Sequence, residues 1–168
     1  TDIEMGGIVS GVLDCYSSGK LGLRDTCYAM ILAMTGRRSI QITSLKIKDL
    51  GAVEGKYFIN FPRGKQRYGK WRSAFKKFPI VEDLWLLLQA QVDSVKALFN
   101  ERIAGGVSAK LVLELPLFPA MDKYHSSESL EELLSGDFLH APTSEINYAM
   151  SVVKSEVAVI SERTGAIT

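Results

Sequence analysis

The sequence has little cysteine: only Cys15 and Cys27 occur among its 168 residues, and their spacing is not that of a metal site. Both lie in apolar stretches with helical periodicity, where a thiol packs as a small hydrophobic group. We therefore expect two buried, reduced cysteines and no metal centre. A chain without disulfides is typical of the cytoplasm, which we take as the expected compartment.

Long hydrophobic runs are also missing. A membrane-spanning helix needs about 18 or more apolar residues, and "VEDLWLLLQAQV" is too short and too interrupted. No signal peptide is recognisable, so we expect no membrane partner. The sequence opens on Thr1 without a methionine and stops at "SERTGAIT" without a closing element. We therefore expect a piece of a longer protein.

An excess of charge of one sign is missing as well, because the net charge is +1. The distribution is uneven, since residues 37–77 are rich in lysine and arginine while residues 114–145 are mostly acidic. A near-neutral total can hide one basic face. The hydrophobic share of 46% suits one globular domain with a sizeable core. No repeat or low-complexity segment interrupts it.

Apolar spacing and capping residues predict helices at both ends of the chain, and alternating residues predict a sheet between them. Residues 45–80 should form a three-stranded antiparallel sheet: "LKIKDL" and "KYFINF" as strands around a "GAVEG" turn, then "RSAFKKFPI". "LVLELPLFPAM" should be an extended segment or core plug. This order of elements predicts an α+β fold, mainly helical. The expected helices cover 3–17, 23–35, a short "RSIQITSL" helix with Ile40 inward, 81–103, "SSESLEELLSG" and 143–164.

The connection between the second and third predicted strands is strongly basic. Residues 63–77 read "RGKQRYGKWRSAFKK", with no acid and with Tyr68 and Trp71 among the cations. Cations beside aromatic rings suit a phosphate backbone. The alternative is a solvated hairpin whose lysines protect a sheet edge. The composition does not decide between the two.

The stretch "YAMILAMTGRRSIQITSLKIKDL" resembles the first conserved box of the tyrosine recombinases, the phage-integrase family. The box is an apolar helix followed by Thr-Gly-x-Arg, an acid, a leucine and a short strand ending in Asp. The basic hairpin falls where that family places a catalytic lysine, and "KQR" resembles integrases of bacterial mobile elements. The matching positions are Thr35, Gly36, Arg38, position 41, Leu45 and Asp49.

The resemblance implies a DNA breaking–rejoining catalytic domain, partial at its C-terminal end, over residues 1–168. Such enzymes form a 3′-phosphotyrosyl link without metal, cofactor or small-molecule ligand. Arg38 would clamp the scissile phosphate, and Lys65 would protonate the leaving 5′ oxygen, with Lys70 as a substitute. Double-stranded DNA would be the partner, with a homo-oligomer on DNA in the longer protein. DNA contacts would come from Arg37, Arg63, Arg67, Lys70 and Arg72.

The sequence departs from the family pattern in two ways. Gln41 replaces the expected acid, and a neutral amide cannot balance a charge. The second box, a His/Lys-x-x-His/Arg-x-x-Arg cluster, and the nucleophilic tyrosine are not found; His125 and His140 do not fit, and Tyr148 is not nominated. We therefore expect this chain alone to be inactive, as the front part of a catalytic domain without its arm-binding domain.

Two other interpretations stay open. The chain could be a non-catalytic DNA-binding module derived from the same fold, for which Gln41 is the best support. It could also be a structural or protein-interaction domain whose arginines form surface salt bridges. Under either DNA interpretation, Arg38 should lie in a concave basic surface near the 63–72 turn.

Overall fold

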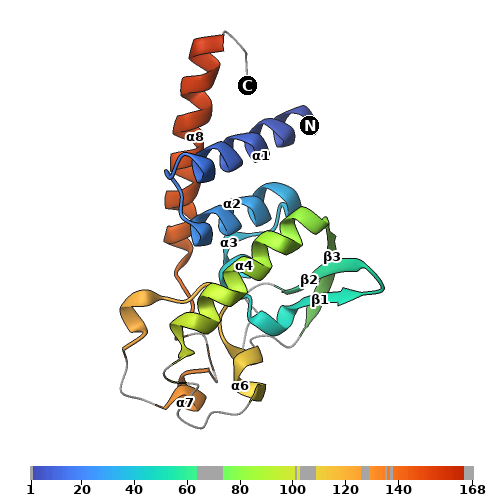
Figure 1. The fold of residues 1–168 in the computed structure, drawn as a ribbon, viewed down its shortest axis with the longest axis vertical. Coiled ribbons are helices and arrows are strands. Elements are labelled where there is room, and N and C mark those ends of the chain that lie inside the picture. The colour runs from blue at the N-terminus through green and yellow to red at the C-terminus, as the bar shows by residue number, and fades with distance from the viewer. Residues whose placement is uncertain are drawn as a thin grey trace. The chain divides into compact units, whose positions relative to one another are not determined.

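The chain divides into two units, whose boundaries in the sequence fall between Arg37 and Arg38 and between Pro142 and Thr143. As predicted, the architecture is α+β, mostly helical, with one small three-stranded antiparallel sheet (Figure 1). The computed structural model describes residues 2–63, 74–100, 102, 109–125, 129–134, 136 and 138–164, with the backbone alone at 2–6, 109 and 156–164.

The first unit is built from three helices that pack on one another: α1 (Asp2–Ser17), α2 (Leu23–Thr35) and α8 (Thr143–Thr164). All three were predicted, α1 and α2 from their apolar spacing and α8 from its capping residues. Their facing residues are almost completely buried and include both cysteines, and burial raises the pKa of the Cys27 thiol. Among the helices that the structure describes, none has the length and apolar character that crossing a membrane requires.

A polar cluster joins α2 to α8 at the edge of this core. The hydroxyl of Tyr28 donates to Glu145 Oε2 at 3.4 Å, and Arg24 Nη2 lies 3.2 Å from the same oxygen. Tyr28 is fully buried, and this burial is the main reason why its pKa is raised. The carboxylate of Glu145 therefore links a buried phenol to a partly exposed guanidinium.

The second unit contains the sheet, with strands β1 (Leu50–Val53), β2 (Lys56–Pro62) and β3 (Phe75–Ile80) in that order. The first predicted strand was displaced: "LKIKDL" forms the 3-10 helix η1 (Ile47–Asp49), and β1 runs through most of "GAVEG". The turn is therefore only two residues, Glu54 and Gly55, both at positive φ (52° and 75°). Two consecutive residues at positive φ are typical of the two-residue turns whose twist matches that of the flanking strands.

One face of the sheet is buried against helix α4 (Glu82–Leu98). This helix was predicted as the longest, over 81–103, but α4 has 17 residues and α8 has 22. Ile59 and Phe61 of β2 are fully buried, and Tyr57 stacks on Trp85 of α4 with ring centroids 4.9 Å apart. The buried face of α4 carries Leu84, Leu88, Gln91, Val92 and Val95. Leu98, predicted on this face, is only half-buried, and Phe99 is buried in its place.

Three extended segments pair along the middle of the second unit. Leu117 N–H donates to Leu45 O at 2.9 Å, and Ile47 N–H donates to Leu115 O at 3.0 Å. A second pairing follows, in which Ala141 N–H donates to Phe118 O at 2.8 Å. Residues 115–120 are all buried, which confirms the predicted core plug for this half of "LVLELPLFPAM".

Two of the sequence-based expectations were wrong in detail. Ile40 was expected inward on the short helix α3 (Ser39–Thr43), but it is 40% exposed, while Gln41, Ile42 and Thr43 are buried. "LVLE" was expected to be extended, but it belongs to helix α6 (Ala109–Glu114). The remaining elements are η3 (Met121–Lys123) and α7 (Leu130–Leu134), the latter as predicted.

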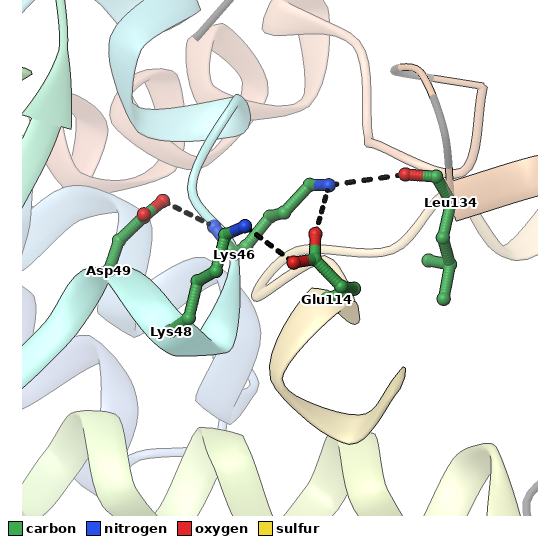
Figure 2. A network of polar contacts seen from close by, with 5 residues as sticks. All are labelled: Lys46, Lys48, Asp49, Glu114 and Leu134. Carbon is green, nitrogen blue, oxygen red and sulfur yellow. Dashed lines mark hydrogen bonds and ion pairs between the residues drawn. The ribbon is translucent and has the colours of Figure 1, made fainter. Parts of the chain in front are cut away.

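A buried lysine ties η1, α6 and α7 together (Figure 2). Lys46 is 4% exposed, and its Nζ donates to Glu114 Oε2 at 2.7 Å and to Leu134 O at 3.1 Å. Lys48 binds the other oxygen of Glu114, and Asp49 Oδ2 accepts from the Lys46 N–H at 2.8 Å. A buried ammonium group requires such partners, because an uncompensated charge in the interior is costly.

The first prediction concerns Gly51 of β1. A Cβ added there would lie 2.3 Å from the ring of Phe58, so Gly51→Ala should lower the free energy of unfolding by about 1–3 kcal/mol. Chemical denaturation measures it. Gly7→Ala is the control, because nothing lies within 4 Å of that added Cβ; it should instead stabilise α1 by about 0.5–1 kcal/mol. Equal effects of the two substitutions would contradict the contact.

The second prediction concerns the pH dependence of stability through Glu114. Burial acts to raise the pKa of Glu114, but the hydrogen bonds and charges of Lys46 and Lys48 outweigh it and the pKa is lowered. The carboxylate therefore stabilises the fold at neutral pH, and this contribution is lost as the pH falls through the lowered pKa. Glu114→Gln should cost about 2 kcal/mol at pH 7, less than for a fully buried pair because Glu114 is partly exposed.

Denaturation across pH measures this difference. The difference in unfolding free energy between the wild type and Glu114→Gln should shrink as the pH falls below 4.5, which is the ordinary pKa of a glutamate side chain. Glu54→Gln, at the exposed hairpin turn, is the control and should change stability by less than about 0.5 kcal/mol. A pH-independent cost of Glu114→Gln would contradict the ionic contribution.

Candidate nucleic-acid interface

The segment of chain that leads to Arg38 begins where α2 ends. Gly36 adopts the left-handed conformation (φ 64°) and donates its N–H to Leu32 O at 3.0 Å, which is a C-cap that favours glycine. Thr35 Oγ1 bonds back to Ile31 O at 2.7 Å and accepts from the Arg37 N–H at 3.3 Å. The Thr-Gly pair therefore ends the helix and turns the chain toward Arg38.

Arg38 is the N-cap residue of α3, with extended backbone angles (φ −70°, ψ 147°). Its carbonyl accepts from the Gln41 N–H at 2.9 Å, and its N–H donates to Gln41 Oε1 at 3.1 Å. These bonds use only the backbone of Arg38. The side chain is exposed, so the guanidinium group faces solvent while its base is fixed.

Gln41 connects this helix start to the sheet. Its side chain is 8% exposed, and Nε2 donates to Pro62 O, the last residue of β2, at 3.1 Å. One amide therefore bonds both the backbone of Arg38 and the end of the strand that leads to Arg63. The Arg63 N–H donates to Ala74 O at 2.8 Å, so the two ends of the basic connection are also held together.

Of the predicted site residues, Arg38 and Arg63 are brought onto neighbouring segments of one unit, and both are exposed. Arg37 belongs to the other unit and is half-buried. The remaining predicted site residues, Lys65, Arg67, Lys70 and Arg72, lie outside the described residues. The predicted concave basic surface therefore stays a prediction, and its described edge is the Gln41 bridge.

The other positions of the box have structural roles. Leu45 is fully buried in the core, and Asp49 caps the backbone at Lys46. His140 is buried, and its Nδ1 donates to Thr43 O at 2.7 Å, since a carbonyl oxygen can only accept. Tyr148 is 65% exposed on α8. Neither His140 nor Tyr148 lies in the segments that Gln41 joins.

Sequence reasoning missed the role of Gln41 as a bridge. It recognised the position as that of an expected acid, but the partner, Pro62, lies on a strand whose register depends on the fold. The usable signal was a long polar side chain at the third position of a short helix, which is where a capping glutamine is found. Among the described residues, no group of three or more His, Cys, Asp or Glu could hold a metal ion.

Comparisons of the chain with known proteins found no matching family model, no matching curated protein and no matching solved structure. The function is therefore considered from the residues themselves.

The third prediction concerns this bridge. Gln41→Ala leaves a backbone N–H and a carbonyl without their partner, so it should lower the free energy of unfolding by about 1–3 kcal/mol. Gln41→Glu separates the two bonds, because a carboxylate can accept from Arg38 but cannot donate to Pro62. Its cost should be greatest at neutral pH and smaller in acid, where the protonated carboxyl group can donate again.

Chemical denaturation at pH 7 and at pH 4 makes the comparison. Gln89→Ala, at a half-buried position of α4, is the matched control and should change stability by less than about 0.5 kcal/mol. A Gln41→Glu variant that is as stable as the wild type at neutral pH would show that the bond to Pro62 contributes nothing.

Proposed function

We propose that this chain binds double-stranded DNA and carries the front part of the catalytic domain of a tyrosine recombinase. The observation that supports the proposal is the Gln41 bridge. It anchors Arg38 to Pro62 at the end of β2, three residues before Lys65 in the sequence. The resemblance assigns these same two cations to one phosphate.

The proposed chemistry follows from the two groups. Attack of a tyrosine on the scissile phosphate builds negative charge on the non-bridging oxygens. The guanidinium of Arg38 stabilises this negative charge with two parallel hydrogen bonds, and it remains positively charged at any working pH. The ammonium of Lys65 gives its proton to the leaving 5′ oxygen. Arg37, Arg63, Arg67, Lys70 and Arg72 hold the DNA backbone.

A second candidate function is that of a DNA-binding module without catalysis, and Gln41 favours it. Where the family pattern has a carboxylate, this chain has an amide whose donor and acceptor both bond protein backbone. The position therefore stabilises the fold without supplying charge to an active site. Both candidates require the same basic surface, and they differ in whether strand cleavage occurs in the complete protein.

The fourth prediction concerns duplex binding. The logarithm of the association constant should fall linearly with the logarithm of salt concentration, with a slope that drops by about one unit for each phosphate contact removed. Arg38→Gln and Arg63→Gln should each reduce this slope by that amount. Lys96→Gln removes one exposed charge from the last turn of α4, away from the bridge, and should leave the slope unchanged.

Fluorescence anisotropy with a labelled duplex, repeated at several salt concentrations, measures these slopes. No binding at low salt, or equal effects of Arg38→Gln and Lys96→Gln, would contradict the proposed surface. A nicked suicide duplex then tests cleavage: we expect this chain alone to form no covalent adduct, since no tyrosine in it matches the nucleophile. An adduct would place the nucleophile within residues 1–168.

A further inference from the structure

The face of the sheet turned away from α4 is open to solvent. Antiparallel register assigns nine strand positions to it, since side chains alternate along each strand and directly paired residues share a face. Five of the nine are exposed and the rest, except Pro62, are half-buried. They are Gly51 and Val53 of β1, Lys56, Phe58, Asn60 and Pro62 of β2, and Phe75, Lys77 and Pro79 of β3.

The composition of this open face is selective. Its only charged groups are Lys56 and Lys77, and none of its nine residues is acidic. Two phenylalanines, a valine and two prolines provide the apolar area, and Phe75 is 40% exposed. Cations beside an exposed ring, without carboxylates, match a chain of phosphates that carries flat bases.

Two residues of the open face pack against the ring of Phe58. Gly51 leaves room for the Phe58 ring on the neighbouring strand, since a Cβ there would lie 2.3 Å from ring carbon Cζ. The ammonium of Lys77 lies 3.9 Å from the centroid of the same ring. The ring therefore holds a cation over the open face through a cation–π contact. A phosphate that reaches Lys77 brings its base or sugar against the neighbouring apolar groups.

We propose that the open face of the β1–β2–β3 sheet binds an unpaired DNA strand. Lys77 and Lys56 contact its phosphates, and Phe75 packs on its bases. An unpaired strand is preferred to a duplex because stacked base pairs hide the flat base surfaces that exposed rings contact. The choice of DNA over RNA rests on the proposed function, whereas binding of an unpaired strand does not depend on Arg38.

The chain offers a closely matched control for this proposal. Lys76 and Lys77 are consecutive exposed residues of β3, but the register places Lys76 opposite Phe61, on the other face. Lys76→Gln and Lys77→Gln remove the same charge from the same strand, so diffuse electrostatic attraction falls equally in both. A difference between them reports which face the nucleic acid contacts.

Anisotropy with a labelled oligothymidylate at fixed ionic strength is the experiment. Lys77→Gln and Phe75→Leu should each weaken binding about tenfold, and Lys76→Gln less than about twofold. Leucine keeps the apolar area at an already exposed position, so folding is not at risk, and thermal unfolding verifies it. The salt slope of duplex binding by Arg38→Gln is measured separately and reports only on the proposed function, so failure of that function and failure of this proposal are distinguishable.

Four outcomes would overturn the proposal. Equal losses for Lys76→Gln and Lys77→Gln would reduce the effect to net charge. An unchanged affinity of Phe75→Leu would exclude stacking. Equal weakening of binding to a duplex of the same length by Lys77→Gln would make the face a duplex contact, and tighter binding of oligouridylate would reassign the ligand to RNA.

Discussion

The backbone pairing of residues 45–47 with residues 115–117 is the constraint on which the second unit depends. These segments are almost seventy residues apart in the sequence, yet they exchange hydrogen bonds at the centre of the unit. Gln91 Nε2 of α4 adds a bond to Leu117 O at 3.0 Å, and His140 adds one to Thr43 O. Both buried side chains therefore bond a backbone carbonyl of this core, since a buried polar group needs a hydrogen-bond partner.

The position of Arg38 in the candidate interface depends on that core. Leu45 is held in the central pairing, and α3 immediately precedes it, so the helix start at Arg38 is positioned from behind. Gln41 then fixes the same turn from the side of the sheet. The side chain of an exposed arginine can adopt many conformations, but the two hydrogen bonds with Gln41 hold the backbone of Arg38 in place. A fixed base reduces the entropy lost when such a group binds a phosphate.

The sequence predicted the elements well where one face is long and regular. α2 and α4 follow from apolar residues three and four apart, and α8 follows from its capping residues. Gly36 was recognised as a helix end because its position needs a left-handed residue. The five-residue α3 was assigned correctly, but it is too short for periodicity to choose its buried face, and Ile40 was placed inward wrongly. "LKIKDL" alternates charged and apolar residues like a strand, yet the side chain of Lys46 is buried while that of Lys48 is exposed.

Lys46 shows why the rest was beyond prediction. Its charge indicated an exposed position, but its ammonium group is buried because Glu114, sixty-eight residues away, and the Leu134 carbonyl receive it. Gln41 is a similar case, since its second partner exists only once β2 is in register. Both side chains depend on contacts that form after the chain has collapsed, and local pattern carries no information about them.

The first unit is assembled from the two ends of the described chain, and this has a consequence for synthesis on the ribosome. α1 and α2 are made before the second unit, but the helix that covers their shared apolar side, α8, is made only after it. The second unit is continuous and has everything that it needs to fold first. Until α8 arrives, the apolar side of α1 and α2 is exposed in the growing chain, which makes this interval the one in which nascent chains are most prone to associate.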